Sequence, residues 1–142
     1  MKVLIINGPN LNLLGKRDTQ IYGDESLEEV NAYIKSCCEK DELVFFQSNH
    51  EGEIIDKIHE AMNHYSGIII NPGAYAHYSY AIRDAIEAVR IPVIEVHLSD
   101  IAKREKFRQI SVTSPVCSAT ISGKGKDGYV MAIEKLRSIL TN

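Results

Sequence analysis

The chain has 142 residues, of which 44% are apolar and 25% charged, and its formal net charge is −3. This length suffices for about one domain with a buried core, and the composition excludes a disordered or fibrous chain. The mild acidity and the lack of long apolar runs exclude an attraction to nucleic acid and a membrane span, and we expect a cytoplasmic protein.

Short apolar runs rich in β-branched residues alternate along the chain with stretches of helical periodicity. The first and third runs are almost continuously apolar, which is typical of parallel strands covered on both faces. Ser26 and Glu29 form a capping box before the first long helical pattern. The expected strands are Lys2–Asn7, Glu42–Ser48, Gly67–Asn71, Pro92–His97 and a weaker fifth within Ile110–Ser122. The helical faces between them begin at Leu27, Ile54, Ile82 and Tyr129, with a shorter helix over Ala102–Phe107.

This alternation of strands and helices predicts right-handed βαβ units in a single domain, residues 1–142. Five strands favour a flavodoxin-like, doubly wound parallel sheet of order 2-1-3-4-5 with helices on both faces. The only long irregular stretch is Gly8–Glu25. Irregular segments of this length are usually functional or disordered, and we expect this one to form a lid over the site.

Each of the first four expected strands ends in a short polar cluster. In open parallel sheets, ligands bind beyond the carboxyl ends of the strands, where these clusters would converge. Their abundance of asparagine and histidine predicts a site for a polar small molecule. The clusters are Asn7–Asn10, Ser48–Glu51, Asn71–Gly73 and His97–Ser99.

Spacing and residue type exclude several well-known kinds of site. The stretch Gly8–Lys16 lacks the glycine spacing of a phosphate loop, and no G-x-G-x-x-G follows the first strand, so no dinucleotide cofactor is expected. His59 and His64 would point in different directions from one helix, which predicts no metal site. The three cysteines, two of them adjacent, predict neither a disulfide framework nor a zinc site.

Four segments of the chain, in order, resemble the type II 3-dehydroquinate dehydratases. They are GPNLNLLGKRDTQIYG, FFQSNHEGEIID, IIINPGAYAHYSYAIRDAI and VIEVHLSDIAKREKFR. The resemblance implies a flavodoxin-like fold, trimers assembled into a dodecamer, and the reversible, cofactor-free dehydration of 3-dehydroquinate to 3-dehydroshikimate in the shikimate pathway. It also implies an anti elimination through an enolate, without a Schiff base. The chain differs from residues common in the family at Thr19, Ala76, Tyr78, Asp100 and Ala119.

The implied reaction removes a proton next to a ketone and expels a hydroxyl group. It therefore needs a base, a means of stabilising the enolate, and an acid for the departing oxygen. By the resemblance, Tyr22 is the base, His97 is the acid, and Asn10 holds a water against the enolate oxygen. A guanidinium close to a phenol favours tyrosinate, and Arg17 and Arg108 are the matching arginines.

The resemblance also assigns the contacts with the substrate. Leu98 and Ser99 match the residues that bind its carboxylate, and backbone N–H groups with a serine hydroxyl suit an anion. Asp84 matches a residue that reaches the site from a neighbouring subunit. Glu95 lies two residues before His97 on the same strand face, and we hypothesise that it orients the imidazole. The other expected substrate contacts are Asn71, Gly73, His77 and Arg108.

A second class of function stays open at this point, a non-catalytic module of the same fold that senses a small anion. The joint presence of Tyr22, Arg17 and His97 favours the enzyme, because a sensor needs neither a base nor an acid.

Overall fold

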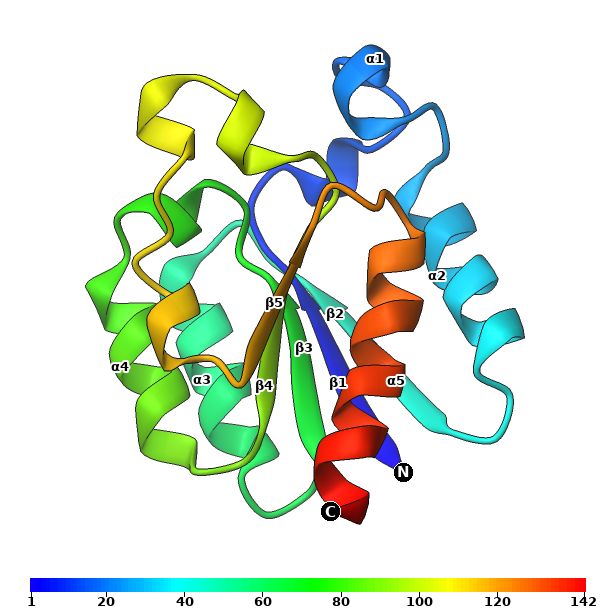
Figure 1. The fold of residues 1–142 in the computed structure, drawn as a ribbon, viewed down its shortest axis with the longest axis vertical. Coiled ribbons are helices and arrows are strands. Elements are labelled where there is room, and N and C mark those ends of the chain that lie inside the picture. Colours follow the sequence, from blue (N-terminus) through cyan, green and yellow to red (C-terminus); the bar gives the residue numbers. More distant parts are fainter.

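The computed structural model describes residues 1–142 and has a five-stranded parallel sheet at its centre (Figure 1). The sheet order is β2-β1-β3-β4-β5, which confirms the predicted flavodoxin-like topology. The fifth strand occupies only the end of the stretch in which it was expected. The strands are β1 (Lys2–Asn7), β2 (Glu42–Gln47), β3 (Gly67–Asn71), β4 (Val93–His97) and β5 (Ala119–Ser122).

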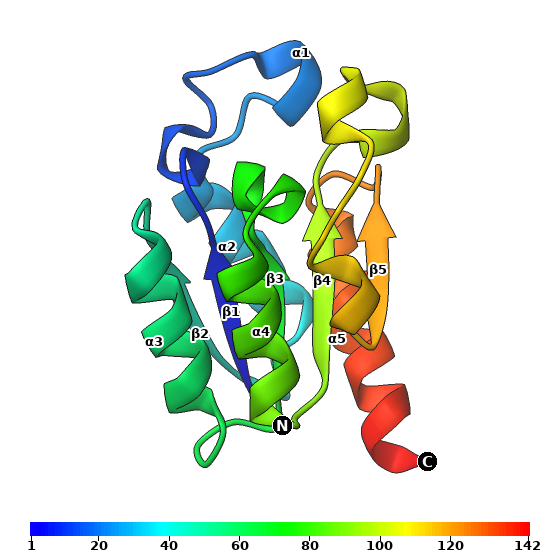
Figure 2. The ribbon, with the colours of Figure 1, turned by 90° about the vertical axis from the view of Figure 1, so that its left-hand side faces the viewer.

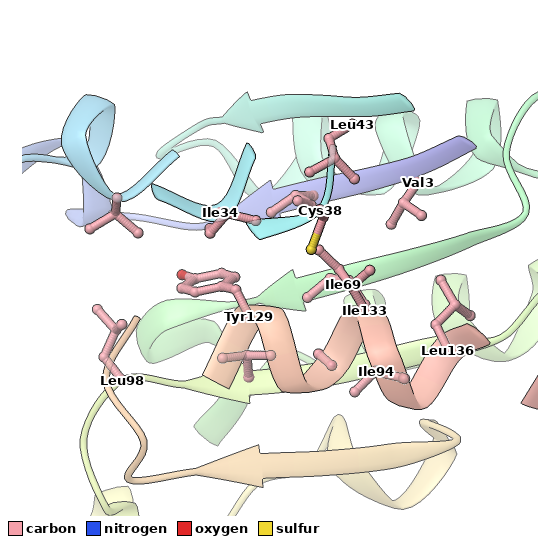
Figure 3. Close-up of a cluster of buried hydrophobic side chains, with 14 of the residues drawn as sticks. Val3, Ile34, Cys38, Leu43, Ile69, Ile94, Leu98, Tyr129, Ile133 and Leu136 are labelled. Carbon is pink, nitrogen blue, oxygen red and sulfur yellow. The ribbon is translucent and has the colours of Figure 1, made fainter. Parts of the chain in front are cut away.

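Two pairs of helices cover the two faces of the sheet (Figure 2). Helices α2 (Leu27–Cys37) and α5 (Asp127–Thr141) pack on one face, and α3 (Glu51–Ala61) and α4 (Tyr80–Val89) pack on the other. Alternate residues of β1 point to opposite faces, so the central strand contributes to both cores. Figure 3 shows the core beneath α2 and α5, which includes the buried aromatic ring of Tyr129. None of the helices is both long and apolar enough to span a bilayer.

The expected capping box is present at the start of α2. Ser26 Oγ accepts the backbone N–H of Glu29 at 3.1 Å, and the Glu29 carboxylate accepts the N–H of Ser26 at 3.2 Å. Ser79 caps α4 in a similar way, because its Oγ accepts the N–H of Ile82 at 3.0 Å. The same hydroxyl donates to Glu51 at 2.6 Å, which ties the start of α4 to the start of α3.

The segment predicted to be irregular, residues 8–25, contains two short helical turns. They are the 3-10 turn η1 (Leu11–Leu13) and the one-turn helix α1 (Thr19–Tyr22), which are too short to leave a periodic pattern in the sequence. Leu11 and Leu14 are buried at the base of the segment. Lys126 holds its far end through an ion pair of 2.7 Å with Glu25. We call residues 8–25 the lid, because they lie above the carboxyl edge of the sheet (Figure 1).

The helix predicted over Ala102–Phe107 is wrong. Two 3-10 turns, η3 (Ile101–Lys103) and η4 (Lys106–Arg108), take its place. The backbone of Arg104 between them is extended, with φ of −94° and ψ of −175°, which interrupts any continuous helix. Two further 3-10 turns, η2 (Gly73–His77) and η5 (Ser114–Val116), follow β3 and precede β5.

Candidate active site

A cavity of about 90 Å³ opens at the carboxyl edge of the sheet, between the lid and the turns after β3 and β4. Three arginines and two histidines line it, and no aspartate or glutamate does. The cavity is therefore cationic although the chain is mildly acidic, and it suits an anionic small molecule. It brings together all the predicted site residues except Asp84 and Glu95, namely Asn10, Arg17, Tyr22, Asn71, Gly73, His77, His97, Leu98, Ser99 and Arg108.

Tyr22 ends α1, and its hydroxyl lies between two guanidinium groups. Nη2 of Arg17 and Nη2 of Arg104 each donate a hydrogen bond of 3.1 Å to the phenolic oxygen. Arg17 also stacks on the ring, with its Cζ 4.2 Å from the ring centroid. Two positive charges this close stabilise a negative oxygen, so the arrangement suits a phenol that must accept a proton.

Arg104 was not predicted from the sequence as a neighbour of Tyr22. Arg108, which was expected beside Tyr22, instead donates to Glu105 through Nε at 2.9 Å and holds the pKa of that carboxyl at about 2. Burial acts to lower the pKa of Arg104, but the hydrogen bonds and charges of Tyr22 and Glu105 together outweigh burial and raise that pKa. Arg104 and Arg108 both lie in the segment VIEVHLSDIAKREKFR. Because this segment is not a regular helix, residue spacing could not show which of the two arginines contacts Tyr22.

His97 ends β4 and lines the cavity, with Glu95 directly behind it. Nε2 of the imidazole lies 2.7 Å from Oε2 of Glu95. Glu95 has no exposed surface, and for this reason it does not line the cavity. Ser111 and Thr113 also donate hydrogen bonds to the Glu95 carboxylate. Neither hydroxyl was predicted from the sequence, because both lie in an irregular segment whose path the sequence pattern does not reveal.

Asn10 enters the cavity from a tight turn at the start of the lid. Its backbone is left-handed, with φ of 69°, a conformation that asparagine adopts more readily than most residues. Its N–H donates to Oδ1 of Asn49 at 3.0 Å, which links the turn to the end of β2. At Gly8 a Cβ would lie 2.4 Å from the carbonyl oxygen of Pro72, so only glycine fits there. The ends of three strands thus fix the position of Asn10.

Asn71 ends β3 and is held from below by Tyr129 of α5. Its Nδ2 donates to the Tyr129 hydroxyl at 3.2 Å, and that hydroxyl donates to Oδ1 of Asn7 at 2.5 Å. Oδ1 of Asn71 accepts the N–H of Gly73 at 3.1 Å. Burial raises the pKa of Tyr129, so its hydroxyl stays a neutral donor. This chain of hydrogen bonds sets the orientation of the Asn71 amide in the cavity wall.

Asp84 lies on the exposed side of α4 and does not reach the cavity of its own chain. His77 connects the same region to the cavity, because its Nδ1 bonds the carbonyl of Ile110 at 2.8 Å and its ring packs edge-on against Phe107. Four large side chains here are 60–67% exposed: Tyr78, Tyr80, Phe107 and Ile110. We call these four residues the apolar patch.

No group of three or more His, Cys, Asp or Glu side chains is placed to hold a metal ion. His59 and His64 are both exposed, but only His59 lies on α3, because the helix ends at Ala61 and His64 follows in a turn. The three cysteines are free thiols.

This chain is similar to known proteins of one family. The family described as "Dehydroquinase class II" matches residues 1–137. A 3-dehydroquinate dehydratase of Caldicellulosiruptor bescii is 58% identical, over 98% of this chain and 98% of that protein. One of Thermotoga petrophila is 53% identical, over 99% of this chain and 97% of that protein. The crystal structure of a type II dehydroquinase from Butyrivibrio crossotus matches with a TM-score of 0.94 and 56% identity, over 96% of this chain and 97% of that one.

Proposed function

The chain belongs to the class II dehydroquinase family, and we infer from this membership that it catalyses the reversible dehydration of 3-dehydroquinate to 3-dehydroshikimate. It is a carbon–oxygen lyase of the shikimate pathway. One observation supports catalysis most directly. The Tyr22 hydroxyl lies between two guanidinium groups, in the same cavity as His97. We propose that the residues of this cavity divide the steps of the reaction among them.

Tyr22 is the base that removes the proton next to the ketone. A free phenol, with a pKa of about 10, is ionised in only about one molecule in a thousand at pH 7. The hydrogen bonds from Arg17 and Arg104 support the tyrosinate form, because they stabilise the charged oxygen. Arg17 lies on the lid with Tyr22, so base and activator approach the substrate together when the lid closes.

The electrons of the broken C–H bond pass to the ketone oxygen, which becomes an enolate. Asn10 holds a water against that oxygen, and its fixed turn supports this role because a preorganised donor costs no reorganisation during the reaction. The enolate then collapses and expels the hydroxyl on the neighbouring carbon. His97 donates a proton to the departing oxygen, which leaves as water, and Glu95 orients the imidazole and balances its charge.

The cationic lining supports binding of the substrate carboxylate. Ser99 and the backbone at Leu98 are the proposed carboxylate contacts. Because the helix expected after Ser99 is replaced by 3-10 turns, this assignment rests on the local hydroxyl and N–H groups and not on a helix dipole. The ring hydroxyls of the substrate contact His77 and Arg108, and Asn71 and Gly73 at the end of β3 are further substrate contacts; all four residues line the cavity.

The proposed route has no covalent intermediate. An imine needs a lysine within reach of the ketone, and no lysine lines the cavity. The tyrosine and histidine pair supplies the base and the acid without one.

We further propose that the chain works in the cytoplasm as a dodecamer built from trimers, in which Asp84 of one subunit completes the site of its neighbour. The apolar patch supports a subunit contact at this place, because exposed aromatic and aliphatic groups next to a cavity are typical of interfaces. Asp84 and Tyr80 are one turn apart on α4, so a subunit that covers the apolar patch also meets Asp84.

An anion sensor on this fold would bind 3-dehydroquinate without converting it. The test is to add 3-dehydroquinate to the purified protein and to follow the enone absorbance of the product. We expect turnover, and we expect Tyr22→Phe to lower kcat by about 10²–10⁴ while leaving the fold intact. Saturable binding with no absorbance change in the wild-type protein would identify a sensor. Near-native turnover by Tyr22→Phe would exclude Tyr22 as the base.

A further inference from the structure

Glu95 is fully buried behind His97, and the hydroxyls of Ser111 and Thr113 surround its carboxylate. Oε2 accepts from Ser111 Oγ at 2.7 Å and also contacts Nε2 of His97 at 2.7 Å. Oε1 accepts from Thr113 Oγ1. Thr113 is itself fully buried, and its Oγ1 lies 3.1 Å from Ser111 Oγ. We call Ser111 and Thr113 the hydroxyl pair.

The hydroxyl pair stabilises the buried Glu95 carboxylate by donating hydrogen bonds to it. A carboxylate without access to water is costly unless donors surround it. The two donors are in turn fixed in place, because Ser111 Oγ accepts the N–H of Ser114 at 3.0 Å and the Cys117 thiol donates to the carbonyl of Thr113 at 3.4 Å. Burial and the nearby charge of Glu95 raise the pKa of Cys117, so this thiol remains a donor. The carboxylate therefore has one well-defined position.

The position of Glu95 determines what His97 can present to a ligand. Nε2 of the imidazole faces Glu95, and Nδ1 has no hydrogen-bond partner within the chain. Since His97 lines the cavity, Nδ1 is the nitrogen available to the substrate. The carboxylate at Nε2 fixes the plane of the ring, so a proton carried by Nδ1 faces the cavity. If the carboxylate turned away, the ring would lose the contact that sets its orientation.

We propose that Ser111 and Thr113 are positioning residues for proton donation by His97, because their hydrogen bonds hold the Glu95 carboxylate in place behind the imidazole. The proposal rests on the proposed role of His97 as the acid. In this step the C–O bond of the substrate breaks as Nδ1–H gives its proton to the departing hydroxyl. Water leaves, and a neutral imidazole remains with its Nε2–H still bonded to Glu95. Neither residue of the hydroxyl pair touches the substrate.

A purely structural role and the proposed role lead to different kinetics. Removal of the α-proton needs Tyr22 and can be followed separately, as the uptake of deuterium from D₂O into recovered 3-dehydroquinate. Loss of the hydroxyl pair should slow dehydration and leave this exchange, because only dehydration needs the acid. Loosened packing would impair both steps together and would lower the thermal stability.

The experiment compares Thr113→Val, Ser111→Ala and the conservative variant Thr113→Ser with the wild-type protein. Because a general acid contributes about 10²–10⁴, we expect Thr113→Val to lower the kcat of dehydration by on the order of tenfold or more, with exchange within about threefold of wild type. Thr113→Ser keeps the hydroxyl and should recover most of the kcat. Ser114→Ala is the matched control, because it removes a hydroxyl from the same segment without touching Glu95. We expect no change in either rate for this control.

Three outcomes would overturn the proposal: unchanged dehydration in both Thr113→Val and Ser111→Ala, a parallel loss of exchange and dehydration, or a Thr113→Ser variant as slow as Thr113→Val. If Thr113→Val does not fold, Ser111→Ala decides alone, since Ser111 is only partly buried. Failure of the proposed function looks different. An inactive wild-type protein, or a His97→Ala variant with full dehydration, would contradict the assigned reaction or acid, whatever the hydroxyl pair does.

Discussion

The guanidinium of Arg104 donates a hydrogen bond of 3.1 Å to the hydroxyl of Tyr22, although 82 residues separate the two in the sequence. The same group donates through Nη1 to Ser99 Oγ at 3.0 Å. A planar, forked cation can reach both oxygens at once, and a point charge on a flexible stem cannot. Arg104 thereby joins the lid that carries Tyr22 to the loop after β4.

Arg104→Lys should therefore lower kcat although it keeps the positive charge. A hydrogen bond to a charged group contributes about 1.5–3 kcal/mol, so the loss of this contact to the tyrosinate predicts a decrease of about tenfold to a hundredfold. The enone absorbance of the product measures it. Lys103→Ala is the control, because the Lys103 side chain is 84% exposed and its removal should leave kcat unchanged. Wild-type kcat in Arg104→Lys would mean that Arg17 alone activates Tyr22.

The sheet could be predicted from the sequence because its strands are short apolar runs with polar ends. Lys2–Asn7 and Gly67–Asn71 pair in register, with Asn7 opposite Asn71, and this places their polar ends together. The cavity residues at these strand ends could therefore be predicted together with the strands. The resemblance added Tyr22 and Arg17, since an irregular lid gives no periodic signal that would place them in the site.

Contacts between irregular segments were beyond the reach of the sequence. Arg104 and Arg108 are both plausible neighbours of Tyr22 until the extended backbone at Arg104 is known. Ser111 and Thr113 contact Glu95 from a segment without helix or strand periodicity. The residue type alone does not tell whether a serine or threonine hydroxyl is exposed or buried. Local spacing also could not reveal that two 3-10 turns replace the expected helix, because turns of three residues are too short to leave a periodic pattern in the sequence.

Tyr129→Phe tests the hydrogen bonds below the cavity. The substitution keeps the ring and removes the hydroxyl, which leaves Oδ1 of Asn7 without its donor and frees the amide of Asn71. Because a buried unpaired polar group costs about 1–3 kcal/mol, the free energy of unfolding in urea should fall by about that amount. KM should rise several-fold with a smaller change in kcat, since Asn71 is a proposed substrate contact.

The matched control for Tyr129→Phe is Tyr65→Phe, because the Tyr65 ring also packs against a core but its hydroxyl makes no hydrogen bond within the chain. We expect this control to leave both the unfolding free energy and KM close to wild type. An unchanged KM in Tyr129→Phe, together with the expected loss of stability, would show that the orientation of Asn71 does not depend on Tyr129.

The lowered pKa of Asp41 makes the free energy of unfolding depend on pH. Its carboxylate has no exposed surface and accepts from the amino group of Met1 at 3.1 Å and from Arg137 at 2.5 Å. Burial acts to raise the pKa of Asp41, but the hydrogen bonds from Arg137 and the amino group outweigh it and lower that pKa. Since the folded-state pKa lies below the unfolded-state value, the stabilisation is complete above about pH 4 and is lost as the pH falls through the folded-state pKa.

Asp41→Asn should accordingly reduce the free energy of unfolding at pH 7, and its difference from wild type should shrink as the pH falls below about 4. Urea unfolding at a series of pH values measures the difference. Glu60→Gln is the control, because Glu60 pairs with Lys57 on the surface at 3.4 Å and should contribute little at any pH. A constant difference between Asp41→Asn and wild type across the acid range would exclude this linkage.

The proposed assembly predicts that two inactive variants can restore each other. Tyr22 lies in the cavity of its own chain, whereas Asp84 is exposed on α4 and is proposed to serve the neighbouring site. Tyr22→Phe and Asp84→Ala should each lose most of their activity. In mixed assemblies, some sites combine the intact Tyr22 of an Asp84→Ala subunit with the intact Asp84 of a Tyr22→Phe subunit. Co-expression of the two variants should therefore give turnover that neither shows alone.

The pairing of Tyr22→Phe with His97→Ala provides the control for this experiment. Tyr22 and His97 line the same cavity of one chain, so every site in such a mixed assembly keeps one of the two defects. This pair should stay inactive, and any gain of turnover would point to contamination or to exchange of the lid between subunits. If the Tyr22→Phe and Asp84→Ala pair also stays inactive while size measurements show mixed oligomers, Asp84 does not act across the interface. In that case Asp84 would be an exposed residue of α4 without a role in catalysis.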